Sequence, residues 1–272
     1  MLKNIYNFRR AIFYSTIINL GLLFLINIQN ENQSLFGLAA IVIYFVILFE
    51  MCYIWFISKE KLKQFDLPLI TTYTKLKEFL HHLMLPSLLY AVIVGFIYFN
   101  NQAALTIPLI TTSFFAFAAL FVNLRAYYQD KLRLEKDTYF VYDLIELLLF
   151  FGAVNVFLHL FERYEYNIGL IVGAVSLGSF LLLIINLYQF EYLRFNSILV
   201  VLVMSILVGI VAFLLINFTS FNLLSINTLI FLFYYFLFGI LSHKVDGSLE
   251  ISVIIEYVSI FLLSLAFLFG IS

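Results

Sequence analysis

Four acidic residues interrupt strongly apolar stretches of this chain. Asp143 and Glu146 lie three residues apart in "FVYDLIELLLFF", so a helix brings both side chains onto one face. Glu50 and Glu256 each lie within another apolar run. A carboxyl group in apolar surroundings pairs with a cation or holds a proton, because burial disfavours the charged form. These acids are therefore candidates for binding a cation, a proton or a basic or polar solute.

Two basic residues join this candidate set. Arg125 is the natural partner for one acid, because its guanidinium group stays charged and matches a carboxylate. One arginine cannot neutralise four acids, so we predict an acidic vestibule built from Glu50, Asp143, Glu146, Glu256, Arg125 and His82. A purely structural role stays open beside it. The helix dipole would then favour Asp143, and the other three acids would be protonated and hydrogen-bonded to neighbouring helices.

The sequence contains no catalytic motif. The four histidines show no HExxH spacing, and neither a GxSxG nor a Walker pattern occurs. The single cysteine, Cys52, excludes an intramolecular disulfide and any cysteine-based metal site. We therefore predict no catalytic residue, no metal ligand and no cofactor. The net charge of −1 gives no indication of nucleic-acid binding.

Composition indicates a membrane protein. The chain has 272 residues, of which 64% are hydrophobic and 11% charged, against about a quarter charged in soluble domains. A soluble globule of this size needs a larger polar surface, so the excess apolar surface must face lipid. Runs such as "SILVVLVMSILVGIVAFLLI" are apolar on every face, unlike the alternating strands of a β-barrel. The predicted fold class is all-α, with the lipid bilayer as its principal partner.

Apolar runs of membrane-spanning length predict about nine transmembrane helices. They cover residues 11–28, 35–57, 79–99, 105–128, 140–161, 168–190, 197–217, 228–242 and 251–270, and the start of the eighth could lie earlier. Short connections leave no soluble domain, so residues 1–272 are predicted to form one transmembrane domain. An amphipathic segment at about 66–80 is predicted to lie on the inner surface. A weak match around Asn123 and Asn186 suggests a lead helix followed by four helical hairpins.

Small residues predict where helices pack closely. Gly169, Gly173 and Gly178 recur along the sixth span, and Gly209 lies in the seventh. Residues without a bulky side chain let two helix backbones approach each other. We expect a large side chain at these positions to disturb packing within the chain.

Three functions are compatible with these features. The first is a transporter or sensor of a small ion or polar solute that uses the acidic vestibule. The second is a membrane subunit or scaffold, whose basic loops bind a membrane or cytosolic protein while the acids hold helices together. The third is an intramembrane enzyme that acts on lipid. Acids spread over several helices favour the first.

The basic residues predict the orientation of the chain in the cell membrane. With a cytoplasmic N-terminus, every Lys and Arg except Arg163 falls on the inner side, which is 14 of the 15 basic residues. Short loops follow this positive-inside bias. An odd number of spans then places the C-terminus outside.

A reporter or a single cysteine fused after Ser272 tests this orientation. We expect labelling by a membrane-impermeant reagent added to intact cells, because nine crossings end on the outer side. The same tag placed before Met1 is the control and should stay protected. Protection of the C-terminal tag would remove one span from the count.

Overall fold

The computed structural model of the protein consists of helices throughout the part of the chain that it describes. The described backbone comprises residues 2–29, 33–62, 70–100, 103–130, 136–164, 167–189, 195–219, 221–245 and 247–271. Side chains are described in a smaller set, namely 8–29, 33–54, 83–100, 105–125, 142–164, 167–187, 196–219, 221–245 and 247–266. The predicted amphipathic segment at 66–80 therefore lies outside the described side chains, and its helix begins at Ile70.

Nine helices form within these described ranges, one for each predicted span. They are α1 (Leu2–Ile28), α2 (Gln33–Leu62), α3 (Ile70–Phe99), α4 (Ala103–Asp130), α5 (Lys136–Tyr164), α6 (Ile168–Gln189), α7 (Phe195–Phe218), α8 (Leu223–Val245) and α9 (Ile251–Ile271). The eighth begins earlier than its apolar run, as the sequence allows. Seven of them are long and apolar enough to cross a membrane, and α3 and α9 contribute shorter apolar stretches. The all-α, multi-pass membrane fold class is confirmed.

Polar side chains at the turns begin and end these helices. The Asn167 side chain accepts a hydrogen bond from the backbone N–H of Gly169 (2.8 Å) at the start of α6. Asn222 accepts one from Ser225 (2.8 Å) at the start of α8. These bonds satisfy N–H groups that have no partner within the helix. Between α8 and α9 the chain turns at Gly247, whose φ of 70° suits a residue without a Cβ.

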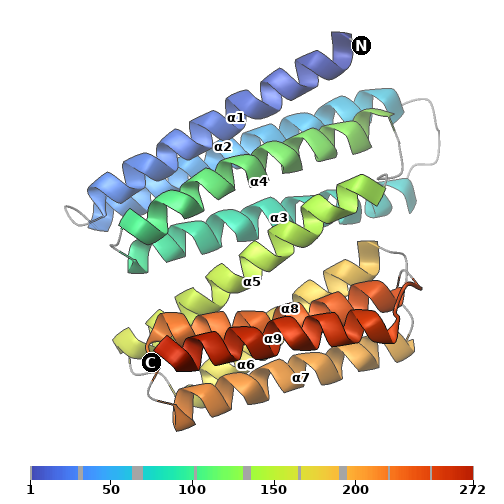
Figure 1. Ribbon diagram of the computed structural model, residues 1–272. Helices are drawn as coiled ribbons and strands as arrows, with labels where there is room; N and C mark the ends of the chain where they lie inside the picture. Colours follow the sequence, from blue (N-terminus) through green and yellow to red (C-terminus); the bar gives the residue numbers. More distant parts are fainter. Residues whose placement is uncertain are drawn as a thin grey trace. The chain divides into compact units, whose positions relative to one another are not determined.

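The chain forms two compact units, Met1–Ile145 and Glu146–Ser272. In the first unit, α1 packs against α2, α3 and α4, and each of these three helices also contacts the other two. Figure 1 shows these four helices running lengthwise beside one another. Aliphatic and aromatic residues fill the space between them, among them Ile18, Leu22, Ile47, Leu89 and Phe117, all essentially inaccessible to solvent.

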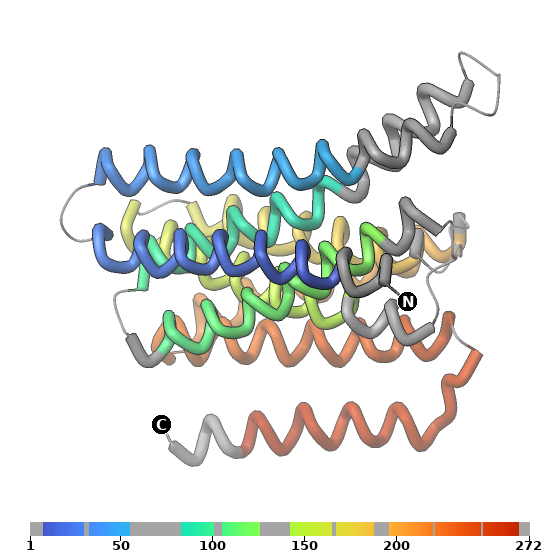
Figure 2. Tube along the Cα trace, turned by 90° about the horizontal axis from the view of Figure 1, so that it is seen from above, coloured from blue at the N-terminus to red at the C-terminus, as the bar shows by residue number. Residues whose placement is uncertain are grey.

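In the second unit, α6 and α7 form the most extensive helix pair, and α8 packs against α6, α7 and α9. Figure 2 shows α9 returning antiparallel to α8 at the end of the chain. Helix α5 contacts α8 through aromatic rings. Phe150 stacks on Tyr234 with ring centroids 3.8 Å apart, and Phe151 meets Phe231 edge-on at 5.4 Å.

The exposed surface of these helices is apolar. Helix α7 exposes, among others, Leu199, Val203, Ile206, Ile210 and Phe213, and α2 exposes a similar row of leucine, isoleucine and phenylalanine. Monomeric soluble proteins rarely expose contiguous apolar surface of this extent. Lipid chains are the solvent that such a surface fits.

Close helix approaches occur at glycines, but only at one of the predicted four. A Cβ built on Gly209 would overlap Ser176 Oγ of α6. At Gly173 and Gly178 an added Cβ meets no described atom within 4 Å, and at Gly169 it meets only the nearby Asn167 side chain, at 3.3 Å. The tight contact between α6 and α7 therefore comes from Gly209 on α7, and the predicted glycines of α6 do not form it.

Two further close approaches were not predicted. Gly21 of α1 lies against Ile43 of α2, where an added Cβ would come within 2.7 Å of a side-chain carbon. Gly239 of α8 lies directly against the ring of Tyr257 in α9. In both cases the glycine makes room for a bulky side chain on the partner helix. A repeat of small residues in the sequence therefore does not indicate these contacts.

Gly209→Leu should destabilise the protein, because its side chain would enter the space that Ser176 and Val172 occupy in the α6–α7 pair. We expect a lower melting temperature for the purified protein in detergent. Gly173→Leu is the matched control on the partner helix, and it should leave the melting temperature unchanged. Equal losses from both variants would contradict the packing described here.

Candidate functional site

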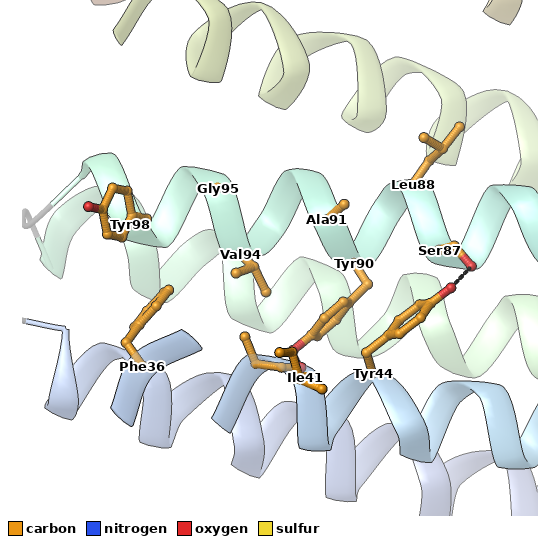
Figure 3. Close-up of a pocket in the computed structure, with 11 residues that line it drawn as sticks. Phe36, Ile41, Tyr44, Ser87, Leu88, Tyr90, Ala91, Val94, Gly95 and Tyr98 are labelled. Atoms are coloured by element: carbon orange, nitrogen blue, oxygen red, sulfur yellow. Dashed lines mark hydrogen bonds between the residues drawn. The ribbon is translucent and has the colours of Figure 1, made fainter. Parts of the chain in front are cut away.

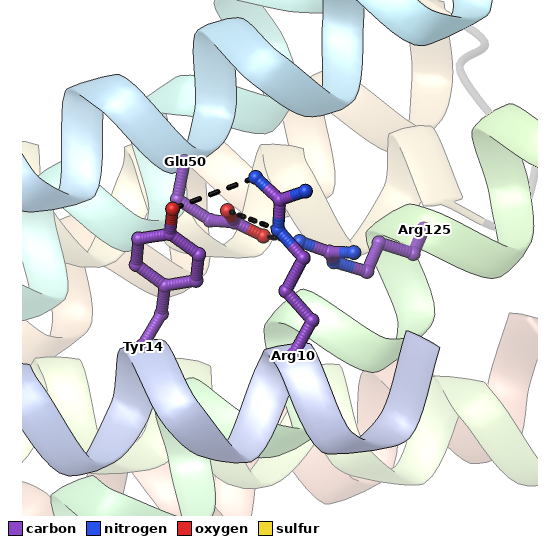
Figure 4. Close-up of polar contacts among 4 residues, drawn as sticks. All are labelled: Arg10, Tyr14, Glu50 and Arg125. Atoms are coloured by element: carbon purple, nitrogen blue, oxygen red, sulfur yellow. Dashed lines mark hydrogen bonds and ion pairs between the residues drawn. The ribbon is translucent and has the colours of Figure 1, made fainter. Parts of the chain in front are cut away.

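Glu50 lies in a buried ion-pair cluster of the first unit. Its side chain, on α2, has no solvent-exposed area. The guanidinium group of Arg125, on α4, forms an ion pair with Glu50 Oε1 and is itself almost completely buried. Figure 4 shows the two side chains meeting between their helices. Arg125 thus pairs with one of the acids, as its residue type predicts.

A second arginine reaches the same carboxylate from α1. Arg10 Nε lies 3.6 Å from Glu50 Oε2, and the Arg10 side chain is 17% exposed. The carbon at the centre of its guanidinium group lies 3.3 Å from the ring centroid of Tyr53, which is cation–π distance. Arg10 also donates a hydrogen bond to the Tyr14 hydroxyl (3.4 Å). Figure 4 shows the Arg10 and Arg125 side chains converging on Glu50.

Helical spacing explains how the cluster is positioned. Arg10 and Tyr14 are four residues apart on α1, and Glu50 and Tyr53 are three apart on α2, so each pair lies on one face of its helix. Because α1 and α2 form a hairpin, these two faces meet. Arg10 was not predicted to belong to this cluster, because its position just before an apolar run also fits the positive-inside bias. Its spacing of four residues from Tyr14 is the feature of the sequence that could have indicated a shared helix face.

The remaining candidates lie in different environments. Glu146, on α5, has no exposed area and makes interactions within the protein. Asp143, one turn earlier, is half-buried and also has a partner. Glu256 is exposed on α9. The side chain of His82 lies outside the described residues. Within the second unit, therefore, Glu146 occupies the interior and Glu256 the surface.

Glu146 belongs to a set of buried polar side chains in the second unit. We call this set the polar row. Its members come from α5, α6 and α8 and are Glu146, Asn155, Ser179, Asn186, Asn227 and Tyr234, each at most 2% exposed. The sequence predicted Asn186 only as part of a weak repeat. It gave no indication of Asn227 or Tyr234, because both lie in an apolar helix without an acidic or basic neighbour.

Ring contacts between α5 and α8 help to order the row along the second unit. Phe150 stacks on Tyr234 while Phe151 meets Phe231. Along α5, Glu146 precedes Phe150 by about one turn and Asn155 follows it. Glu146 and Asn155 are separated by about 13 Å along α5, from the helical rise per residue. The polar groups of α5 therefore lie on both sides of the position of Phe150 along that helix.

The second unit also contains a small cavity. This cavity, of about 180 Å³, is lined among others by Leu187 of α6, Asn196 and Ser197 of α7, and Leu241 and Lys244 of α8. Asn186 precedes Leu187 in the chain but does not line the cavity. Lys244 is exposed there.

A larger groove, of about 630 Å³, lies between α2 and α3 in the first unit. Figure 3 shows Tyr44 and Tyr90 on its wall. Their hydroxyl groups bond within the protein, Tyr44 with Ser87 (3.0 Å) and Tyr90 to the carbonyl of Ala40 (2.6 Å). With these hydroxyls engaged, the groove presents mainly apolar surface, and its lining contains no Asp, Glu, His, Lys or Arg.

No set of three or more His, Cys, Asp or Glu side chains in the described part of the chain has the arrangement of a metal site. Comparison with protein-family models, with curated proteins and with solved structures finds no match for this chain. The candidate site therefore rests on the geometry of the chain itself.

Glu50→Gln should lower the melting temperature of the purified protein, because it leaves the buried Arg125 without its ion-pair partner. Breaking such a pair costs about 3 to 5 kcal/mol. Glu256→Gln is the control, since Glu256 is exposed and should contribute little. The double variant Glu50→Gln, Arg125→Gln should recover part of the loss. Equal melting temperatures for Glu50→Gln and Glu256→Gln would contradict a stabilising cluster.

Proposed function

We propose that this membrane protein moves or senses a small ion or polar solute through the second unit, with Glu146 as the residue that binds a proton or cation. The observation that carries the proposal is the complete burial of the Glu146 carboxyl group in a helix of membrane-spanning length. Ionisable residues in such helices are costly, about 2.5 to 3.5 kcal/mol on insertion scales, and commonly mark ion or proton pathways.

The polar row supports movement rather than simple binding. A proton or a small polar solute crosses hydrocarbon only where successive polar groups replace its hydration. The row supplies hydroxyl, amide and carboxyl groups from three helices. The sequence predicts few polar residues beyond Asn155 and His159 in the parts of the spans that lie in the outer half of the membrane. The burial of Asn227 in α8 supports the proposal by adding another amide to the interior of the second unit.

The two buried acids have different surroundings. Glu50 is held by Arg125 and Arg10 and joins three helices. A carboxylate that forms ion pairs with two guanidinium groups holds the helices that carry them together. We therefore assign the exchanging role to Glu146 and a positioning role to Glu50.

A second candidate function is a membrane subunit or scaffold. The ion-pair cluster favours it, because a carboxylate that links α1, α2 and α4 stabilises a helix bundle without any transport. In that case the basic loops, on the proposed cytoplasmic side, would bind a membrane or cytosolic protein. The two functions differ in what they require of Glu146, which only transport or sensing needs as a titratable group.

Glu146→Gln is expected to abolish proton movement into liposomes that contain the purified protein, measured with an enclosed pH-sensitive dye under an imposed membrane potential. Glutamine keeps the shape and hydrogen-bonding capacity of the side chain and removes its titratable proton. Asp143→Asn, one turn away and half-buried, is the matched control and should retain most of the movement.

If transport is of another cation, wild-type liposomes should take up that cation, tested with sodium, potassium and lithium, and Glu146→Gln should again abolish uptake. Wild-type protein that moves neither protons nor these cations, and whose Glu146 carboxyl shows no protonation change in vibrational difference spectra between pH 5 and pH 9, would contradict the proposal. That result would favour the scaffold.

A further inference from the structure

Asn227 is a polar residue whose side chain has no hydrogen-bond partner in the part of the chain that the structure describes. It lies in the second turn of α8 and has no exposed area. Neither its amide nitrogen Nδ2 nor its amide oxygen Oδ1 forms a hydrogen bond with any described group. An amide without partners in apolar surroundings is costly, from about 1 to several kcal/mol. Its burial therefore calls for a molecule that can both donate and accept a hydrogen bond.

Other helical asparagines of this chain avoid that cost within their own helix. Asn27, Asn100 and Asn217 each donate from Nδ2 to the carbonyl oxygen four residues earlier, at 3.1, 2.9 and 2.9 Å. Thr228, next to Asn227, does the same with Leu224 (2.8 Å). Asn227 makes no such bond, so its amide group is available to the interior of the second unit.

The surroundings of Asn227 contain further polar groups. Tyr234 lies seven residues later on α8, which is two helical turns along the same face. Asn155 is also buried, on α5, the helix whose Phe151 ring meets Phe231 of α8. Buried amide groups are the setting in which internal water molecules make two to four hydrogen bonds.

We propose that Asn227 lies in a hydrated site inside the second unit and binds water there. The inference deepens the proposed function, since water at Asn227 supplies the polar row with exchangeable protons. Only the supply of protons to the polar row rests on the proposed function. The presence of water at Asn227 is inferred from the burial and packing of α8.

Reaction of a cysteine at this position tests the proposal. In a Cys52→Ala background, which removes the exposed native thiol, Asn227→Cys is compared with Ile230→Cys. Ile230 is equally buried on α8, but its side chain is apolar. Methanethiosulfonate reagents react with the thiolate, which forms in water and not in a dry apolar interior. We expect Asn227→Cys in lipid nanodiscs to react about tenfold faster or more.

Equal rates for the two cysteines, or no reaction at Asn227→Cys, would overturn the proposal. If the cysteine variant does not fold, Asn227→Asp keeps the size of the side chain and adds a titratable carboxyl group. In a hydrated site this carboxyl should be ionised at pH 7. Its ionisation is measured from the carboxyl band in the vibrational difference spectrum between the variant and the wild type. A carboxyl that stays protonated at pH 7 would show a dry site and also overturn the proposal.

These results separate hydration from function. Loss of transport in Glu146→Gln together with an unreactive Asn227→Cys would leave the proposed function standing and remove the hydrated site. A reactive Asn227→Cys in a protein that transports nothing would do the reverse.

Discussion

Inside hydrocarbon no water is present to bond polar groups, and this constraint governs the described structure at every level. Backbone amides must find partners within their own segment, so the chain forms long helices joined by short capped turns. Serine, threonine and asparagine side chains mostly return to carbonyls one turn earlier, as Thr112 does to Pro108 and Ser205 to Val201. Polar groups that do not follow this pattern are few, and they are the positions at which the chain departs from a simple apolar bundle.

The two units meet this constraint in different ways. In the first, Glu50 is surrounded by cations and aromatic rings, with Arg125 and Arg10 at its oxygens and Tyr53 beneath Arg10. Such an arrangement holds one geometry. In the second, Glu146 shares the interior with hydroxyl and amide groups on three helices. Neutral polar groups accommodate both forms of a carboxyl, which is why we propose proton or cation exchange in that unit.

The groove between α2 and α3 shows why burial and chemistry must be considered together. It is the larger of the two hollows described here, yet the hydroxyls of Tyr44 and Tyr90 bond within the protein and its walls carry no charge. The polar row contains the carboxyl of Glu146 and the amide of Asn227, which has no hydrogen-bond partner among the described residues. For a proton or small ion, the chemistry of the lining outweighs the size of the hollow.

The sequence by itself determined the fold class and the helices, because both depend on the length of apolar runs and on the scarcity of charge along the chain. It also identified Glu50, Glu146 and Arg125 as costly in lipid, since that cost belongs to the residue type. The tertiary structure alone decided which side chains meet. Arg10 reaches Glu50 because α1 and α2 form a hairpin, Glu256 is exposed because α9 packs mainly on α8, and Gly209 rather than Gly173 forms the tight contact. Asn227 and Tyr234 are each unremarkable in an apolar run, and only the packing of α8 against α5 makes them part of one buried row. Partners that are distant in sequence are chosen by helix register and rotation, which local composition does not specify.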